Sequence, residues 1–373
     1  MTTIRIRSSR GNYDALLAPR LLAHAGALVR RAGEFSDVYV ISSPRVWRYW
    51  GSTLTQGIPG WSDKRKVLFD DSESKKSLAT VEVIARQLVR AGADRRAVIV
   101  ALGGGVVGDV AGFVAATYVR GVRLVHIPTT FVAQVDSCIG GKTGVDLPEG
   151  KNLIGAFYPP SQILADPETL ATLPQREYRS GLYEVIKYGV IADAALFVYL
   201  CRNMPALLRR DPKALAYVIP RCMRIKADVV SRDERESGLR QILNFGHTLG
   251  HALESATYYR RFLHGEAIGW GMIAATLLAV AKNRLAERDA AAIIRLVSAV
   301  GQRPSLSGIR AARLPKILAS DKKSRHGSVR WVLPKRIGRV EWGIELPWKL
   351  VAAAFAELPK VAASRTQATK QSA

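Results

Sequence analysis

The sequence predicts an α/β fold in which an N-terminal, Rossmann-like parallel-sheet domain is followed by a mainly α-helical domain. In the first half of the chain, short apolar runs alternate with amphipathic helical patterns, as in sheets whose two faces are covered by helices. Beyond about residue 175, strand patterns become rare and long helical patterns dominate. We therefore expect an α/β domain at 1–174, a mainly helical domain at 175–359 and a basic, disordered tail at 360–373.

The predicted elements follow one another in a regular order. Four apolar runs predict buried strands, at 37–42, 97–102, 122–127 and 162–166. Helical spacing of apolar residues lies between them, at 77–92 and 106–119. Strand character returns briefly at 328–334, where we expect a hairpin within the helical domain.

Composition restricts the class of protein. The chain has 373 residues, of which 48% are hydrophobic, and this is enough for two cores. No run approaches the roughly 20 apolar residues of a membrane span, and the N-terminus lacks the apolar core of a signal peptide. The three cysteines have no metal-ligand spacing, which indicates free thiols in a reducing compartment. We expect a cytoplasmic protein without a membrane partner.

The formal net charge of +24 is unusual. Clustered Lys and Arg would favour a nucleic-acid partner through counterion release. The basic residues are scattered along the chain, however, and the most basic stretch, 302–339, has few aromatic residues for base stacking. No helix-turn-helix, zinc-finger or RNA-recognition signature occurs. We therefore favour a generally basic surface over specific nucleic-acid binding.

A glycine-rich turn, "VIVALGGGVVGD" (98–109), joins a predicted strand to a predicted helix. It satisfies the G-x-G-x-x-G spacing, in which glycines let the backbone approach a pyrophosphate and free helix amides attract its charge. Glycine required only for turn geometry is the alternative. The acidic residue expected about 20 positions later is absent, since that position reads "HIPTT". We interpret the turn as a dinucleotide site whose ribose is read from elsewhere.

Two further segments carry polar groups suited to an anionic ligand. The segment 134–152 contains four glycines together with Asp136, Lys142, Lys151 and Asn152, and glycine-rich backbone with lysines suits phosphate or carboxylate recognition. A flexible loop with solvated lysines is the alternative. Farther along, Glu184 and Lys187 stand three apart in an otherwise apolar helical pattern. Burying both charges would be costly without a metal or an anionic partner.

Three of the six histidines, His247, His251 and His264, fall within one short window. On a helix, Arg240, Asn244, His247 and His251 would form a polar stripe with spacings of 4, 3 and 4. His247 and His251 have the spacing of two zinc ligands on a helix, and Glu184 could complete the set with His264. Spacing leaves open whether both are ligands or one transfers protons. These patterns together predict a metal- and NAD-dependent enzyme acting on a small anionic substrate.

Four long motifs carry a resemblance to a known family. They are "GGGVVGDVAGFVAATYVRG" (103–121), "PTTFVAQVDSCIGGKTGVDLPEGKNLIGAFYPP" (128–160), "RSGLYEVIKYGVIAD" (179–193) and "RDERESGLRQILNFGHTLGHALE" (232–254) followed by "LHGEA" (263–267). In these motifs the chain resembles the 3-dehydroquinate synthase family of the sugar phosphate cyclases. The resemblance is dense across 97–275 and continues more weakly from about 37 to 350.

The resemblance implies a dehydroquinate synthase-like fold and a lyase of the shikimate pathway. The family cyclises 3-deoxy-D-arabino-heptulosonate 7-phosphate to 3-dehydroquinate with loss of phosphate. It uses NAD+ catalytically for a transient oxidation, which is followed by phosphate elimination, re-reduction, ring opening and an intramolecular aldol closure. Zinc or cobalt would polarise the oxidised oxygen. A homodimer is also implied.

The resemblance also assigns roles to individual residues. The implied metal ligands are Glu184, His247 and His264, which leaves His251 as a proton-transfer or supporting residue. The implied catalytic residues are Lys142, Lys187, Arg240, Asn244 and His251. The implied substrate residues, seven of which are cationic, are Arg120, Asp136, Lys142, Lys151, Asn152, Lys187, Lys226, Arg240, Asn244 and Lys322. The implied NAD residues are Asp71, Ser72, Glu73, Ser74, Lys75, Lys76, Gly105, Val106, Val107, Gly108, Asp109, Thr129, Thr130, Lys142, Lys151, Thr169, Leu170, Ala171 and Thr172.

The chain departs from the family pattern at two positions and leaves rival activities to test. Ser43 stands where the family usually has Asp or Asn, and Ser72 stands where it has Gly, while Glu73 remains a candidate ribose reader. One rival is a related cyclase such as an aminodehydroquinate synthase. Another is an NAD- and metal-dependent polyol-phosphate dehydrogenase, which would produce net NADH.

Overall fold

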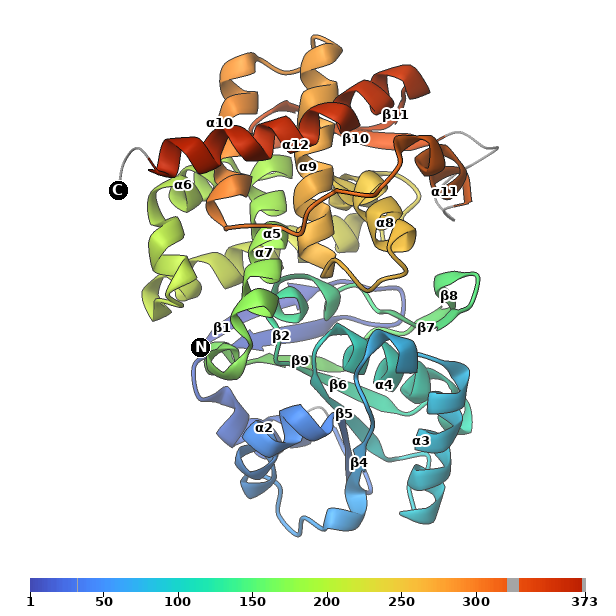
Figure 1. Cartoon of the computed structure of the whole chain (residues 1–373). Helices are drawn as coiled ribbons and strands as arrows, with labels where there is room; N and C mark the ends of the chain where they lie inside the picture. The colour runs from blue at the N-terminus through green and yellow to red at the C-terminus, as the bar shows by residue number, and fades with distance from the viewer. Residues whose placement is uncertain (32, 321–328, 371–373) are drawn as a thin grey trace. The chain divides into compact units, whose positions relative to one another are not determined.

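The structure is a computed structural model that describes residues 1–31, 33–320 and 329–370 (Figure 1). The chain divides into two compact units. The sheet unit comprises Met1–Tyr178 and Leu215–Glu234, and the helical unit comprises Arg179–Ala214 and Arg235–Ala373. The division of an α/β part from a helical part confirms the predicted fold class.

The sheet unit is built on seven strands in the order β1-β2-β9-β6-β5-β3-β4. Their bounds are β1 Thr2–Ile6, β2 Tyr13–Leu17, β3 Val38–Ser42, β4 Lys66–Leu68, β5 Val98–Gly103, β6 Arg123–Pro128 and β9 Gln162–Ala165. Each neighbouring pair is parallel except β1 with β2, which is antiparallel. β7 (Lys142–Leu147) and β8 (Gly150–Phe157) form a separate antiparallel hairpin. All four strands predicted in this part of the chain are present.

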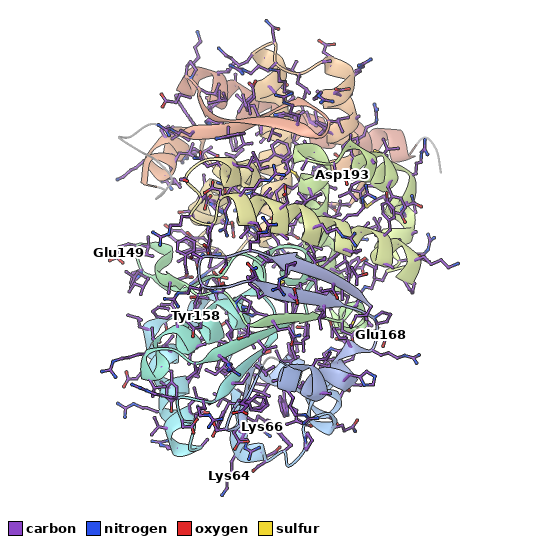
Figure 2. The ribbon with its side chains drawn as sticks, turned by 180° about the vertical axis from the view of Figure 1, so that it is seen from behind. Lys64, Lys66, Glu149, Tyr158, Glu168 and Asp193 are labelled. Carbon is purple, nitrogen blue, oxygen red and sulfur yellow. The ribbon has the colours of Figure 1, made fainter. Side chains whose placement is uncertain are left out.

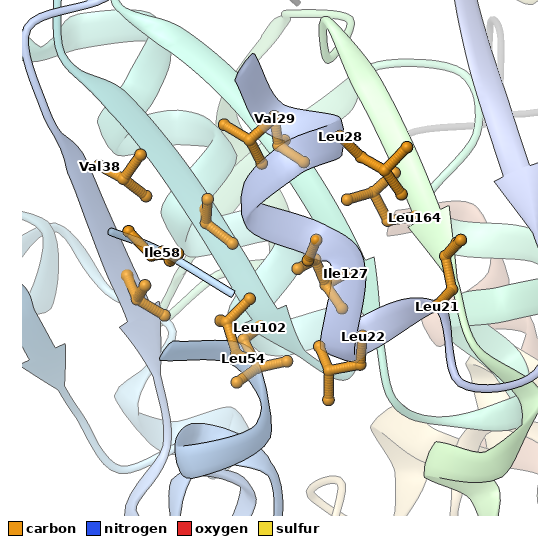
Figure 3. Packing of buried hydrophobic residues seen from close by; sticks show 14 of the residues in the cluster. Leu21, Leu22, Leu28, Val29, Val38, Leu54, Ile58, Leu102, Ile127 and Leu164 are labelled. Carbon is orange, nitrogen blue, oxygen red and sulfur yellow. The ribbon is translucent and has the colours of Figure 1, made fainter. Parts of the chain in front are cut away.

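Helices cover both faces of the sheet, which explains its nearly continuous apolar strands. The helices of this unit are α1 Ala25–Arg31, α2 Pro44–Gln56, α3 Leu78–Arg90, α4 Gly105–Thr117 and most of α7 Pro212–Arg232. Along β3, Val38 and Val40 pack with residues of α1 and α2, whereas Tyr39 and Ile41 pack with residues of α3 and α4. This alternation follows from the two-residue period of a strand. Figure 3 shows the first of these two clusters.

The helical unit is arranged around α9, His264–Ala281, whose residues are buried on nearly every side. Its other helices are α6 Ala194–Leu208, α8 His247–Ala256, α10 Glu287–Ala299, α11 Leu314–Ser320, α12 Trp348–Lys370 and most of α5 Gln175–Ile191. α9 contacts α8, α10, α12 and the first strand of the hairpin β10 (Arg330–Arg336) and β11 (Arg339–Glu345). By length and composition α9 could cross a membrane, but 78% of it is buried inside the protein, as expected of a core helix.

The structure differs from two expectations drawn from sequence pattern. α12 continues through residues 360–370, which we expected to be disordered. The alanines of this segment, together with its lysine, arginine and glutamine residues, favour helix. Most of α7 also groups with the sheet unit rather than with the helices around it in the sequence. Residues 371–373 lie outside the described part of the chain.

Short helical turns connect the longer elements. They are η1 Leu21–His24, η2 Asp63–Arg65, η3 Glu73–Lys75, η4 Tyr118–Arg120, η5 Ala133–Ser137, η6 Pro167–Thr172, η7 Leu239–Asn244 and η8 Ala311–Arg313. Several of them follow the carboxyl ends of the parallel strands, where the residues expected to bind a nucleotide lie.

Candidate active site

The helical unit brings a carboxylate and two imidazoles together from three helices. Glu184 lies within α5, while His247 and His264 are the first residues of α8 and α9. Nε2 of His247 lies 3.6 Å from Oε1 of Glu184, and Nε2 of His264 lies 3.2 Å from the same atom. The candidate ligand atoms of these three residues lie within 4.8 Å of one another. They are therefore close enough to hold one ion.

The other nitrogen of each imidazole is already engaged. Nδ1 of His247 lies 3.2 Å from the carbonyl oxygen of Phe245, and Nδ1 of His264 lies 3.2 Å from Oε2 of Glu254. A proton on each Nδ1 satisfies these contacts, so each Nε2, which faces Glu184, is the nitrogen that can give up its proton and bind a metal ion. Metal-binding histidines are commonly oriented in this way.

The residues present fit a divalent metal ion. Both oxygens of Glu184 are buried and accept no hydrogen bond of ordinary geometry from the described residues. Their cationic neighbour is Lys187, whose Nζ lies 2.5 Å from Oε2, and both side chains are only 1% exposed. Two imidazole nitrogens and one carboxylate oxygen form a donor set of catalytic zinc sites that leaves a coordination position open.

The electrostatics of the cluster also favour a cation. Burial alone would lower the pKa of His264, but the carboxylates of Glu254 and Glu184 outweigh it and raise the pKa to about 10. A second group of possible ligands consists of His251, Glu254 and His264. His264 belongs to both groups, whereas His247 belongs only to the group that contains Glu184. The ring centroid of His251 lies 5.4 Å from that of His247.

Close backbone packing explains how three helices deliver these residues to one place. A β-carbon at Gly271 would lie 1.8 Å from the carbonyl oxygen of Gly246, so α9 can approach the start of α8 only with glycine there. A β-carbon at Gly265 would lie 1.9 Å from the carbonyl oxygen of Ser180. The amide of Gly265 also donates to Oγ of Ser180 at 2.9 Å, which sets the start of α9 one turn before Glu184 on α5.

The interpretation of Arg240, Asn244, His247 and His251 as a stripe on one helix is wrong. Arg240 and Asn244 lie in η7, which ends at Asn244, and α8 begins at His247. Gly246 separates the two helices because its φ of 83° lies in the left-handed region that favours glycine. Arg240 is nevertheless 3% exposed, and the side-chain amide of Asn244 donates to Oε1 of Glu236 at 2.6 Å.

In the sheet unit, the residues expected to bind NAD lie at one edge of the sheet. They follow the carboxyl ends of four parallel strands, at 71–76 after β4, 105–109 after β5, 129–130 after β6 and 169–172 after β9. Open α/β sheets bind their ligands at this edge. Ser43 follows β3 and caps α2, since its Oγ accepts from the amide of Val46 at 3.4 Å.

The glycine-rich turn has the local geometry of a phosphate-binding turn. Gly104 is the N-cap of α4, and a β-carbon there would lie 2.7 Å from Cγ2 of Thr130. The amide of Thr129 donates to the carbonyl oxygen of Gly103 at 2.9 Å, which joins the ends of β5 and β6. The first amides of α4 have no partner within the helix, and such amides attract anions.

Lys76 connects several of the segments that are expected to bind the nucleotide and the substrate. Its Nζ donates to Oδ2 of Asp109 at 2.6 Å and to Oδ1 of Asn152, and lies 3.9 Å from Oδ1 of Asp146. Burial alone would lower the pKa of Lys76, but the carboxylates around it, led by Asp109, raise the pKa and keep the ammonium charged. Nearby, Nζ of Lys151 pairs with Oε1 of Glu73 at 3.1 Å.

The residues expected to bind substrate are distributed over both units. In the sheet unit, Nζ of Lys226 donates to the carbonyl oxygen of Asp136 at 2.7 Å and also pairs with its carboxylate. Arg120 and Asn152 have φ of 69° and 53°, and such strain in non-glycine residues clusters at functional sites. Lys142 is exposed at the start of β7. Lys322 lies outside the described residues.

Sequence pattern missed two residues of these clusters. Glu254, the partner of His264, is seven residues after His247 and three after His251, so helical spacing could have placed it on their face of α8. Asp146 approaches Lys76 only through the fold of the hairpin β7–β8, and no local signal marks that contact.

The sheet unit of this chain contains a parallel sheet with a glycine-rich turn, and the helical unit contains a Glu/His cluster. These features define a class of nucleotide- and metal-dependent enzymes. Family models for the N- and C-terminal parts of 3-dehydroquinate synthase match residues 66–180 and 181–324. The chain belongs to the 3-dehydroquinate synthase family, which confirms the resemblance seen in its motifs. It is 44% identical over 362 residues to the 3-dehydroquinate synthase of Koribacter versatilis, covering 96% of this chain and 98% of that protein.

Two solved structures of related cyclases are similar to the whole chain. One is a 2-deoxy-scyllo-inosose synthase complexed with carbaglucose-6-phosphate, NAD+ and Co2+, with a TM-score of 0.85 and 28% identity over 95% of this chain and 99% of that one. The other is the 2-epi-5-epi-valiolone synthase of Streptomyces hygroscopicus with NAD+ and Zn2+ bound, with the same TM-score and identity over 96% and 99%.

Proposed function

We propose that this chain is a 3-dehydroquinate synthase, which converts 3-deoxy-D-arabino-heptulosonate 7-phosphate to 3-dehydroquinate and phosphate. The observation that carries the proposal is the Glu184, His247 and His264 cluster. It occurs in a chain that is 44% identical to a named synthase over nearly its full length. The +24 net charge is compatible with a substrate that carries both a carboxylate and a phosphate.

Glu184, His247 and His264 would hold Zn2+ or Co2+, the ions named in the two similar structures. A divalent ion bound there supplies a Lewis acid that polarises a substrate oxygen. Lys187 pairs with Glu184 at 2.5 Å and holds the orientation of its carboxylate. The imidazole of His251, whose ring centroid lies 5.9 Å from that of His264, would transfer a proton near that ion.

NAD+ would occupy the carboxyl edge of the sheet, with its pyrophosphate against the amides of Gly105–Asp109. Bound NAD+ supplies a hydride acceptor that is regenerated in each turnover, so no net oxidation occurs. Glu73, which pairs with Lys151, is the candidate acceptor for the ribose hydroxyls. Ser43 lacks the carboxylate of a usual ribose reader, and its hydroxyl is used to cap α2.

The cationic residues would bind the two anionic groups of the substrate. Among the described cationic residues implied for substrate, Lys187, Arg240 and Lys226 are buried, the first two in the helical unit and the third in the sheet unit. A charge removed from water binds an anion more strongly than a solvated one. Asn244 and Asn152 offer neutral hydrogen bonds to hydroxyl groups, and the exposed Lys142 and Arg120 offer further positive charge.

A cytoplasmic homodimer is the expected setting of the enzyme. Cys138, Cys201 and Cys222 are free thiols, as expected in a reducing compartment. The family resemblance supports the dimer, and molar mass from light scattering would measure it. A monomeric mass at working concentration would contradict that part of the proposal.

The experiment supplies the purified protein with Zn2+, NAD+ and the heptulosonate phosphate, and follows phosphate and dehydroquinate together. We expect equal amounts of both products and no accumulation of NADH. Net NADH without phosphate would indicate a polyol-phosphate dehydrogenase. Turnover of only the amino analogue of the substrate would indicate an aminodehydroquinate synthase. Either result would overturn the proposed activity.

A further inference from the structure

The carboxylate of Glu254 contacts one residue of the candidate metal centre, His264, and has no role in the proposed reaction. It belongs to α8 and is 2% exposed, so it is buried within the helical unit. A carboxylate in such surroundings is costly unless it is paired. Its Oε2 lies 3.2 Å from Nδ1 of His264.

We propose that Glu254 is a positioning residue that fixes the tautomer and the ring orientation of His264. Its carboxylate accepts the Nδ1–H of His264, so that Nε2, which lies 3.2 Å from Oε1 of Glu184, is the nitrogen left to bind the metal ion. The inference rests on the metal site proposed above and adds to it the residue that holds one of the ligands in place.

The two imidazoles differ in how much external support they need. His247 is 11% exposed, and the carbonyl oxygen of Phe245, two residues earlier, already contacts its Nδ1. His264 is 36% exposed and stands at the first position of α9. Its Nδ1 is contacted by a side chain from another helix, that of Glu254. Loss of Glu254 therefore removes the side-chain support of the more exposed ligand.

Glu254 could instead be a ligand itself, because His251, Glu254 and His264 also form a possible metal group. The two roles exclude each other at His264, since a nitrogen that donates its proton to Glu254 cannot also bind a metal. The buried oxygens of Glu184, which accept no hydrogen bond of ordinary geometry from the described residues, favour the ion beside Glu184. This leaves Glu254 as the hydrogen-bond acceptor.

The test measures Co2+ binding to the metal-free full-length protein by competition with a chromophoric chelator, together with the visible spectrum of the bound ion. For Glu254→Ala we expect Co2+ affinity to fall by roughly 10- to 100-fold, as for other residues that support a metal ligand. We also expect a changed Co2+ spectrum, because His264 is no longer held. Glu254→Gln should restore most of the affinity and the wild-type spectrum, since its amide oxygen still accepts the Nδ1–H.

Asp193→Ala provides a structural control within the helical unit. Asp193, labelled in Figure 2, caps α6 by accepting from the amide of Leu196 at 2.9 Å. Its loss should lower the temperature of thermal unfolding and leave the affinity and the spectrum of bound Co2+ unchanged. A spectral change in this variant would mean that destabilisation alone moves the readout, and would remove the support for the positioning role.

Three other results would overturn the inference. Glu254→Ala could bind Co2+ with the affinity and spectrum of wild type, which would leave Glu254 without a role at the metal. Glu184→Gln could retain full affinity while both Glu254 variants lose it, which would make Glu254 a ligand. Wild type could bind no Co2+, which would overturn the proposed metal site and the inference together.

Discussion

Replacement of Lys76 by Met should unfold the protein at a distinctly lower temperature. Lys76 is 4% exposed and pairs with Asp109, which is 24% exposed and would be left without its closest cation. Breaking a buried pair by removing one partner costs about 3–5 kcal/mol. Because Asp109 is partly solvated, we expect the free energy of unfolding to fall by an amount near the lower limit, about 3 kcal/mol. In units of 150–250 residues, a loss of about 1 kcal/mol lowers Tm by about 2–4 °C. The loss expected for Lys76→Met therefore lowers Tm by about 6–12 °C.

The assay is thermal unfolding followed by circular dichroism, with NAD+ binding measured on the same samples by calorimetry. Burial raises the pKa of Asp109, so the lone carboxyl in Lys76→Met should take up a proton at higher pH than a solvated aspartate. The double variant Lys76→Met, Asp109→Asn should recover part of the lost stability, because it removes the unpaired charge. NAD+ binding should weaken in both variants, since both lose Lys76 and its contact with Asp109, two of the residues expected to bind NAD.

The exposed ion pair of Arg86 and Glu82 on α3 is the matched control. Their side chains are 67% and 63% exposed, and such pairs contribute about 0.3–0.5 kcal/mol. Arg86→Met should therefore shift Tm by about 2 °C or less. If Lys76→Met shifts Tm no more than Arg86→Met does, the claim that the buried ion pair of Lys76 and Asp109 stabilises the protein is refuted.

Three further predictions concern the core and the metal centre. Burial lowers the pKa of His126 from 6.5 to about 4. As pH falls, this histidine therefore takes up a proton in the unfolded chain before it does so in the folded protein. The free energy of unfolding should fall by up to about 3 kcal/mol as pH drops from 6.5 to 4. His126→Leu should flatten this part of the urea-midpoint profile against pH, and an unchanged slope would contradict the assignment. Gly271→Ala should lower Tm by more than 5 °C and weaken Zn2+ binding, because the new β-carbon would lie 1.8 Å from the carbonyl oxygen of Gly246. A wild-type Tm together with wild-type Zn2+ affinity would show that α8 and α9 can separate freely. Glu184→Gln should lower Zn2+ affinity at least 100-fold in a chelator competition, because it removes the anionic ligand, and an affinity within threefold of wild type would exclude Glu184 as a ligand.

The sheet could be predicted because its strands are buried on both faces. Runs such as Val98–Gly103 are continuously apolar, and this pattern is typical of a parallel strand beneath two layers of helix. The hairpin of β1 and β2 was missed because its strands carry charged residues, Arg5 and Asp14, that pair on the surface. β1 is also an edge strand of the sheet, and short edge strands that carry charges give a weak signal in sequence.

The candidate site was predicted residue by residue mainly through long motifs, because its geometry depends on contacts distant in sequence. Spacing suggested that His247 and His251 act together, whereas the structure groups His247 with His264 and Glu184. The turn at Gly246 and the close approach at Gly265 produce this grouping, and neither contact has a local pattern that predicts its partner. The pairing of Lys226 with Asp136 is equally distant, because α7 packs with the sheet unit.

The central claim is that Glu184, His247 and His264 form the metal centre of a 3-dehydroquinate synthase. The most direct measurement adds Zn2+ in steps to the metal-free protein, with NAD+ and the heptulosonate phosphate present, and records the rate of dehydroquinate formation. The account predicts a rate that rises linearly, stops at one equivalent of Zn2+ per chain, and is absent in a folded His264→Ala variant. Full dehydroquinate formation before any metal is added, or an unchanged titration in His264→Ala, would contradict it.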